Sequence, residues 1–520
     1  MLSMARFTKL LNKNRFVQIH RLYSDTGKCL VLGVRTEGVG EGRKHVFTPT
    51  AESFNQKTGG KLNELLEPHC HIGHREVKVF DNIDPEFKHV AVVNVGTVED
   101  GYNPSEHMDE VKENVRLGVA IGTRKLRDLG SEHILVEDFG QSECAAESAT
   151  LSAWRYKDPQ PKIELYGAED EAGFNIGLVK GDAQNLARYF SSSPPNIVTP
   201  HLFAEGAQDV LCSCGLKVEI RLKDWIDGMN MRALLAVTRG SCEPPAVLEA
   251  TYCGGEEDER PIVMIGKGVT YDSGGLNLSN DPKADVTGAG AIVSMMRAIA
   301  ILRLPINVNC VIPLCENVPS GMCMQPGDII MSRSGKTIMV EDTDNEGRLI
   351  VADAIDYAFH QYTPEMILSI GSFTRGFETA LGSSASPVFS NTSYFWDEMH
   401  TAGAITGDRV WRLPLWKHYK HMIDGIRCAD LTNSVMEYHF HEKGEPCVAG
   451  AFLKEFIPCG NWMHMDISNT SMAKDEDFPY LTKGKMTGRP TRTLIQFLYQ
   501  LACKNADKRR KREEKEIKEQ

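Results

Sequence analysis

Two short stretches of the chain, 266–275 and 342–349, place carboxylates beside a basic residue in glycine-flanked turns. With Asp285, three of their carboxylates and Lys267 make a set of four carboxylates and a lysine. Oxygen ligands of this kind suit Mg²⁺ or Mn²⁺ and also Zn²⁺. The set is typical of a two-metal hydrolytic centre, in which two divalent ions about 3.5–4 Å apart hold a water and a substrate oxygen. The candidate metal ligands are Lys267, Asp272, Asp285, Asp344 and Glu346.

The expected local structure explains how these side chains could converge. An apolar run at 261–265 predicts a strand that leads into the first stretch, and α/β enzymes place their sites at such strand ends. We expect Asp285 at the start of the next helix, where the helix dipole favours an anion. Asp344 and Glu346 are two residues apart, so in an extended segment both would point the same way. Lys267 can bind a metal only when neutral, and nearby cations lower its pKa.

Taken singly, each of these elements is a weak signal. An isolated Asp-x-Glu is usually a surface turn, and a Gly-Lys-Gly after a strand could also suggest a phosphate loop. The GxxxxGK[ST] pattern of such loops is absent from 266–275, which argues against nucleotide binding. The joint occurrence of the two stretches is more specific than either one.

The rest of the chain predicts an α/β protein with two domains. Short apolar runs that alternate with helical stretches indicate a mostly parallel sheet flanked by helices in each domain. A helix followed by Pro194 and Pro195 marks the break between the domains, because proline cannot extend a helix. The predicted limits are 28–180 for an N-terminal domain, 181–196 for a linker, 197–503 for a C-terminal domain and 504–520 for a charged tail.

The first 24 residues hold five basic residues and no acid. This composition is typical of a mitochondrial transit peptide, and it predicts a mitochondrial location, with the cytoplasm as the alternative. A disordered basic arm is the plainer interpretation of the same segment. At the other end, 507–520 is almost entirely charged, which predicts a solvated helix or a disordered end.

Bulk composition excludes two classes of partner. The net charge of the 520 residues is −12, which argues against nucleic acid as a partner. No apolar run approaches the ~18 residues of a membrane span, so we expect no membrane insertion. Two histidine-rich segments, 69–74 and 438–442, lack the paired spacing of a closed zinc site and are interpreted as a loop and a strand.

Further motifs carry a resemblance to a known family. The segment 342–349 is similar to the signature Asn-Thr-Asp-Ala-Glu-Gly-Arg-Leu of the leucyl aminopeptidase (cytosol aminopeptidase, M17) family, and 266–275 matches the family's Gly-Lys-Gly segment throughout. The segments 315–321, 334–337 and 486–493 also look like family sequence. The resemblance extends over about 28–503.

The resemblance implies a di-metal exopeptidase with its site in the C-terminal domain and a homohexameric assembly. It assigns two divalent ions, Mn or Zn and also Mg, to the five candidate ligands, with Asp272 and Glu346 bridging them. It further implies that Arg348 holds a bicarbonate that acts as general base. The implied substrate is a peptide with a free N-terminus.

Two departures from the family pattern bear on activity. Ser279 stands where the family has a catalytic lysine, and 371–376 replaces the family's Thr-Leu-Thr-Gly substrate loop with a bulkier and charged sequence. Lys283 lies close by, but at the wrong spacing to substitute. The chain in this respect resembles mitochondrial, sperm-type insect members of the family. These changes leave two hypotheses open, a slowed aminopeptidase and a catalytically silent structural protein that keeps the metal site.

Overall fold

The computed structural model describes residues 27–38, 44–68, 72–97, 101–157, 159–167, 170–278, 283–374, 376–424, 428–435, 444–476 and 478–519. Three features of the sequence therefore lie outside the described residues: the basic segment 1–24, Ser279, and the histidine-rich cores at 69–71 and 436–443. Lys283 belongs to a strand, but its side chain is not described.

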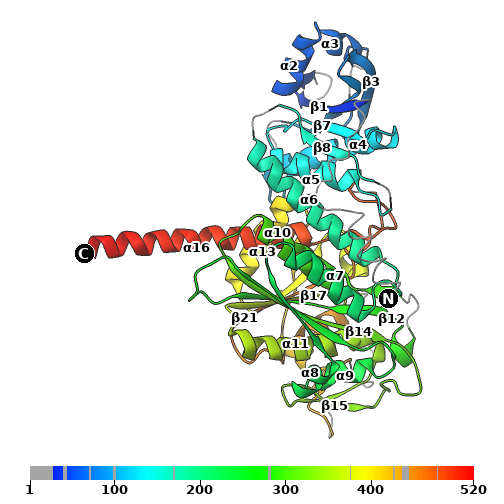
Figure 1. Cartoon of the computed structure of the whole chain (residues 1–520), viewed down its shortest axis with the longest axis vertical. Helices are drawn as coiled ribbons and strands as arrows, with labels where there is room; N and C mark the ends of the chain where they lie inside the picture. Colours follow the sequence, from blue (N-terminus) through cyan, green and yellow to red (C-terminus); the bar gives the residue numbers. More distant parts are fainter. Residues whose placement is uncertain are drawn as a thin grey trace.

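The N-terminal part is built on a six-stranded sheet with the order β3-β4-β1-β7-β8 and with β2 beside β1 (Figure 1). The pairs β1–β4, β1–β7 and β7–β8 are parallel, whereas β3 and β2 are antiparallel to their neighbours. The strands are β1 (Lys28–Glu37), β2 (Lys44–Phe47), β3 (Val77–Asp84), β4 (Phe87–Asn94), β7 (His133–Val136) and β8 (Lys162–Leu165).

The C-terminal part contains a ten-stranded sheet whose central strands are parallel, with the order β12-β14-β11-β17-β21. Antiparallel strands extend it at both ends. Its strands are β9 (Lys217–Leu222), β10 (Ala246–Cys253), β11 (Ile262–Gly266), β12 (Gly268–Asp272), β13 (Lys283–Asp285), β14 (Asn307–Asn317), β17 (Met366–Gly371), β18 (Ser386–Ser390), β19 (Val410–Arg412) and β21 (Asn461–Asp466).

Two smaller sheets complete the strands. One joins β15 (Ile329–Met331), β16 (Thr337–Met339) and β20 (Leu431–Thr432), and the other pairs β5 (Tyr102–Asn103) with β6 (Met108–Asp109).

Helices cover both large sheets, as expected for sheets of parallel strands. In the N-terminal part these are α2 (Pro49–Lys57), α3 (Lys61–Leu66), α4 (Glu110–Asp128) and α5 (Ser142–Ala153). In the C-terminal part they are α7 (Pro200–Cys212), α8 (Lys223–Gly228), α9 (Arg232–Thr238), α10 (Thr287–Ile301), α11 (Glu346–Tyr362), α12 (Gly376–Leu381), α13 (Ser393–Thr406), α14 (Lys417–His421) and α15 (Glu445–Lys454), with 3-10 turns η2 (Gly275–Asn277) and η3 (Thr343–Asn345).

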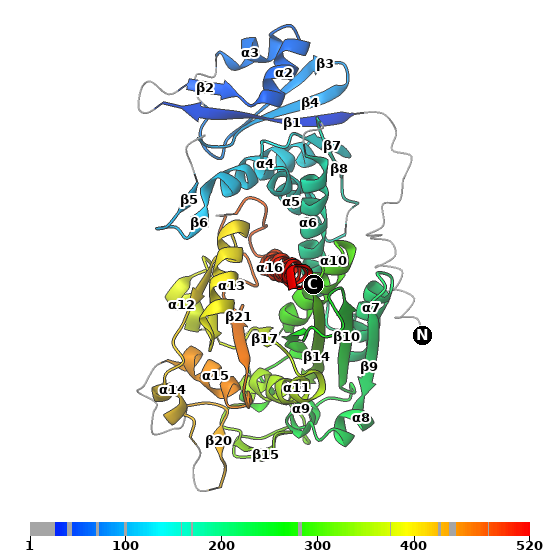
Figure 2. The same ribbon diagram turned by 90° about the vertical axis from the view of Figure 1, so that its left-hand side faces the viewer.

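Two long helices tie the parts together. Helix α6 (Glu171–Ser192) runs between the two sheets, and α16 (Thr491–Glu519) packs against α6 and α10 before it leaves the body of the molecule (Figures 1 and 2). The Asp170 side chain caps α6 by accepting from the amide of Gly173, and the helix ends just before Pro194.

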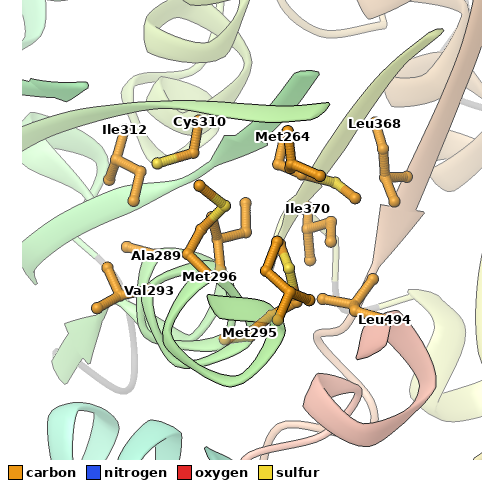
Figure 3. Packing of buried hydrophobic residues seen from close by; sticks show 14 of the residues in the cluster. Met264, Ala289, Val293, Met295, Met296, Cys310, Ile312, Leu368, Ile370 and Leu494 are labelled. Atoms are coloured by element: carbon orange, nitrogen blue, oxygen red, sulfur yellow. The ribbon is translucent and has the colours of Figure 1, made fainter. Parts of the chain in front are cut away.

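The main core lies between the large sheet and α10. Figure 3 shows side chains of β11, β14 and β17 facing those of α10 and α16, with the sulfurs of Met264, Met295, Met296 and Cys310 among them. Unbranched methionines fill irregular space between a twisted sheet and a helix. This packing fixes the strand ends from which the functional side chains come.

The α/β class and its two sheets are confirmed, and several boundaries differ from the prediction. Helix α6 begins at Glu171, so the helix expected before Pro194 starts ahead of the predicted linker of 181–196. The charged end is helical and continues α16, which runs from Thr491 to Glu519. Within the described residues, no helix is long and apolar enough to cross a membrane.

Candidate metal centre

The centre is built around Lys267, which lies between β11 and β12. Its amide donates to the carbonyl of Ile370, so its main chain is fixed to β17. Its side chain passes between two glycines: a Cβ at Gly347 would lie 2.6 Å from its Cε, and one at Gly371 would lie 2.5 Å from its Cβ. Any side chain at either position would displace the lysine. The two glycines therefore make room for it.

The Lys267 ammonium is buried among oxygen atoms. Its Nζ lies 2.6 Å from Oδ2 of Asp285 and 2.9 Å from Oε1 of Glu346, and it donates to the carbonyl of Ser372 at 2.8 Å. Burial acts to lower the pKa of Lys267, but the carboxylates of Asp285, Glu346 and Asp272 outweigh it and hold the pKa well above its usual value. Without metal, the lysine is the cation of the cluster.

Three carboxylates of the centre lie close together. Asp272, Asp344 and Glu346 each offer an oxygen, and these oxygens all lie within 4.8 Å of one another. Burial and the charge of Asp272 raise the pKa of Glu346 to about 8. The pKa of Asp272 is raised by burial as well. Carboxylates held this close repel one another unless a cation lies between them.

Asn317, at the end of β14, holds two of these carboxylates in place. Its side-chain amide donates to Oδ1 of Asp272 at 3.0 Å, to Oε2 of Glu346 at 3.3 Å and to the carbonyl of Thr343 at 3.0 Å. The hydroxyl of Thr343 in turn donates to the carbonyl of Gly274 at 2.7 Å. The two stretches picked out from the sequence are thus joined directly.

The backbone around the acids differs from the prediction in two ways. Asp285 ends strand β13 and lies two residues before α10, so it is not at the helix start. Asp344 lies in the 3-10 turn η3, and Glu346 is the first residue of α11, so neither is in an extended segment. The turn brings both carboxylates to one side, and the start of α11 favours the negative charge of Glu346.

The donor set fits a divalent cation. Asp272, Asp285, Asp344 and Glu346 bring four carboxylates, and Lys267 forms ion pairs with Asp285 and Glu346. The excess of partly buried negative charge is what a divalent ion would neutralise. The five residues predicted from the sequence as ligands are therefore brought together, and their role as ligands stays a prediction.

Arg348, one turn along from these acids, is fully buried. Its Nη1 donates to the carbonyl of Asn433 at 2.6 Å, and its Nη2 forms an ion pair with Oε1 of Glu445 at the start of α15. Burial lowers the pKa of Arg348 to about 10, still well above neutrality. The guanidinium already has a carboxylate of its own chain. The expected bicarbonate at this arginine stays a prediction.

The segment after β17 turns its bulkiest residue inwards. The ring of Phe373 lies 5.5 Å from the Lys267 ammonium and 4.6 Å from the ring of His464, and the residue is 8% exposed. Thr374 donates to Oδ2 of Asp466 at 3.1 Å. The Phe373 ring thus lies beside the Lys267 ammonium. Arg375, the charged residue of the segment 371–376, lies outside the described residues.

Sequence reasoning missed several residues that shape the centre. Asn317 and Ser372 contact the predicted ligands, and Thr343 accepts from Asn317 and donates to the carbonyl of Gly274. Asn317 lies in the family-like segment 315–321, which was a usable signal. The contacts of Ser372 include a hydrogen bond from its hydroxyl to Asp285. Ser372 follows β17 and Asp285 ends β13, two strands that are not neighbours in the sheet, so this contact has no local signal.

The fold and the acidic cluster define a class: an α/β protein with a candidate cation centre at the ends of parallel strands. The catalytic-domain model of the cytosol aminopeptidase family matches residues 185–495. The chain is 39% identical to the cytosol aminopeptidase of Bos taurus over 95% of this chain and 97% of that one. It is 40% identical to the cytosol aminopeptidase of Homo sapiens, over 93% of this chain and 94% of that one. It is 34% identical to the cytosol aminopeptidase of Dictyostelium discoideum, over 87% of this chain and 90% of that one. The chain belongs to the cytosol aminopeptidase family.

Solved structures agree with this placement. The bottromycin maturation enzyme BotP superposes with a TM-score of 0.77 at 25% identity, covering 92% of this chain and 99% of that one. A second structure of BotP, in complex with Mn, gives a TM-score of 0.76. The family consists of di-metal enzymes that are typically oligomeric.

Proposed function

We propose that this protein is a di-metal aminopeptidase that removes N-terminal amino acids from peptides, at a reduced rate. The observation that carries the proposal is the convergence of Asp272, Asp344 and Glu346 within 4.8 Å beside the Lys267–Asp285 pair. The identity of about 40% to cytosol aminopeptidases over most of the chain supports it.

The residues have distinct roles in this proposal. Asp272, Asp285, Asp344, Glu346 and Lys267 would hold two divalent ions, Mn or Zn and also Mg. When bound, such ions polarise a carbonyl and lower the pKa of a water. Asn317 keeps two of the carboxylates in a fixed orientation. Phe373, Gly347 and Gly371 pack around the Lys267 side chain. Burial of the cluster strengthens every charge interaction within it.

The reduced rate follows from position 279. A serine cannot supply the positive charge that the family's lysine directs at the substrate, and loss of one such group typically costs about 10²–10³ in rate. A catalytically silent structural or assembly protein of mitochondria is the second candidate. Ser279 favours it, together with the altered loop at 371–376.

The test is an assay of the purified protein with Mn²⁺ on leucyl anilide, beside a Ser279→Lys variant. Slow turnover by the natural chain, raised about 100-fold in the variant, would support the proposed aminopeptidase. Turnover at the same rate in both would show that position 279 does not limit the reaction. Absence of turnover in both, with Mn²⁺ bound, would favour the structural role.

Assembly and location complete the proposal. We propose a homohexamer in mitochondria, on the basis of the family's oligomeric habit and the composition of residues 1–24. Light scattering of the purified protein would give the mass of the assembly. Sequencing of the mature N-terminus from tissue would test the location, since an intact Met1 would contradict a cleaved transit peptide.

A further inference from the structure

Glu445 is the first residue of α15, and its carboxylate is in contact with the buried guanidinium of Arg348. The side chain as a whole is 38% exposed, but Oε1 itself is buried. The Glu445 carboxylate therefore points inwards, towards the Arg348 guanidinium. Nothing in the sequence pattern drew attention to this residue.

The surroundings of Arg348 explain why an anion belongs there. The guanidinium is fully buried, and its hydrogen bond goes to a neutral carbonyl, that of Asn433. The carboxylates of Asp342, Asp466 and Glu346 act on it through their charge, whereas Glu445 is in direct contact. Asn433 is itself fixed, because its side chain accepts from the amide of Glu341 at 2.9 Å and donates to the carbonyl of Asp342 at 2.7 Å. A buried guanidinium requires a counter-charge, and a carboxylate matches its geometry best.

Glu445 is held in position by its helix. Helix α15 packs on α11, the helix that carries Arg348. Next along, Pro446 lies against the start of α12, where a Cβ at Gly376 would come within 2.7 Å of the proline ring. The first turn of α15 also favours an acidic side chain through the helix dipole. The carboxylate is thus tethered next to its cation.

We propose that Glu445 is a built-in anion of the centre, which occupies the place at Arg348 that a dissolved carboxylate-like anion such as bicarbonate would otherwise fill. A carboxylate that the fold already holds beside the guanidinium binds it without the entropy cost that a dissolved anion meets, so it competes well with such an anion. The proposal rests on the proposed function only in so far as Arg348 belongs to the same centre. It predicts that the protein does not respond to bicarbonate.

The test compares the Mn²⁺-loaded full chain with its Glu445→Ala and Glu445→Gln variants. Thermal unfolding is recorded with added potassium bicarbonate and with the same concentration of potassium chloride. We expect the Tm of the natural chain to be equal in both salts, and the Tm of Glu445→Ala to be higher in bicarbonate, because an anion that binds the folded state stabilises it. Glu445→Gln keeps the shape but not the charge, and serves as the second variant if Glu445→Ala does not fold.

Glu378→Gln is the matched control, because Glu378 lies on α12 and pairs with Lys474 away from Arg348. It should behave like the natural chain. An equal bicarbonate effect in the natural chain and in Glu445→Ala would overturn the proposal, as would no effect in either Glu445 variant. The Tm measurement does not depend on turnover. Absence of peptidase activity would therefore refute the proposed function, but the effect of bicarbonate on Tm could still be interpreted.

Discussion

At the residue scale, the feature that governs the centre is an imbalance of charge. The Lys267 ammonium pairs with Asp285 and Glu346, and Glu346 lies close to Asp272 and Asp344, so four carboxylates share one cation. The pKa values of Asp272 and Glu346 are both raised, because burial and neighbouring carboxylates disfavour their charged forms. A divalent ion would relieve this repulsion. Binding of metal should therefore stabilise the folded chain.

We expect Mn²⁺ at about 100 times its Kd to raise the free energy of unfolding by about 2.7 kcal/mol, and EDTA to remove the gain. Asp272→Asn should lose most of this effect, because it removes the negative charge of one of the three clustered carboxylates. Asp128→Asn, at an exposed carboxylate in the N-terminal part, should keep it. Thermal unfolding with Mn²⁺ and with EDTA measures both. Equal Mn²⁺ effects in the two variants would contradict the assigned site.

His464 gives a second prediction, on pH. The ring is buried between Phe373, Phe389 and Trp462, and burial lowers its pKa from 6.5 to about 3. Between these values the unfolded chain binds a proton that the folded chain does not. Stability contributed by the neutral ring is present above pH 6.5 and is lost as pH falls towards 3.

This histidine should account for a loss of about 2 kcal/mol between pH 7 and pH 5. His464→Gln should show a correspondingly shallower decline in the free energy of unfolding over that range, measured by urea titration at each pH. His201→Gln, at an exposed position on α7, should keep the natural slope. An unchanged slope in His464→Gln would show that the ring is not the titrating group.

The types and spacing of the five candidate ligands were sufficient to predict that they would meet, because each lies at a strand end or at the start of α11. The partners of Arg348 were not predictable. Glu445 and Asn433 are 97 and 85 residues away along the chain, and only the packing of α15 on α11 brings the carboxylate to the guanidinium. Long-range pairs of this kind leave no local pattern in a single sequence.

At the element scale, the position of α10 relative to β17 depends on one glycine. A Cβ at Gly288 would lie 2.3 Å from the carbonyl oxygen of Ile370, a backbone atom that cannot move aside. Gly290, two residues along the same helix, meets its nearest neighbour, Cβ of Phe190, at 3.2 Å. The first turn of α10 therefore lies directly against the strand that ends at Gly371.

Gly288→Ala should destabilise the protein by about 1–3 kcal/mol through overpacking and should also weaken Mn²⁺ binding, because α10 follows Asp285. Gly290→Ala gains about 1 kcal/mol of helix propensity against a small steric cost, so its net effect should be near zero. Chemical denaturation and Mn²⁺ titration of both variants give the comparison. Equal stability of the two would contradict close helix–strand contact at Gly288.

Hydrophobic runs were sufficient to predict whether a segment is a strand or a helix, but they did not predict where several of these elements begin and end. The apolar run at 89–95 predicted a strand, and the observed β4 begins two residues earlier and ends one residue earlier than that run, since a mostly apolar run signals a buried strand. The antiparallel hairpin of β12 with the three-residue β13 was missed, and Asp285 was placed on a helix instead. A strand this short has no pattern of its own, and pairing with β12 defines it.

At the scale of the whole molecule, buried charges join the N-terminal and C-terminal parts. Glu147 on α5 accepts from Nε of Arg116 at 2.9 Å and from Nη1 of Arg492 on α16 at 2.8 Å. Arg116 also donates to the carbonyl of Ile405 at 2.8 Å. Burial acts to raise the pKa of Glu147, but the two arginines outweigh it and lower the pKa to about 2. The Glu147 carboxylate thus binds Arg116 of the N-terminal part and Arg492 of the C-terminal part.

Removal of this carboxylate should weaken the whole molecule, because it would leave two buried guanidinium groups without their shared partner. We expect Glu147→Gln to lower the free energy of unfolding by about 3–5 kcal/mol, the usual result of breaking a buried ion pair from one side. Glu205→Gln, at a partly exposed acid on α7 that pairs with the exposed His201, should change it by no more than about 0.5 kcal/mol.

Urea denaturation followed by two probes would show how the two parts depend on one another. If Glu147 couples them, fluorescence of Trp154, beside α5, and circular dichroism of the whole chain should give coincident transitions in the natural protein and separate ones in Glu147→Gln. A small, coincident shift would mean that the apolar contacts of α6 and α16 hold the parts together without the buried charges. The sequence offered no warning of this network, since Glu147 and Arg492 are 345 residues apart and meet only through the packing of α16.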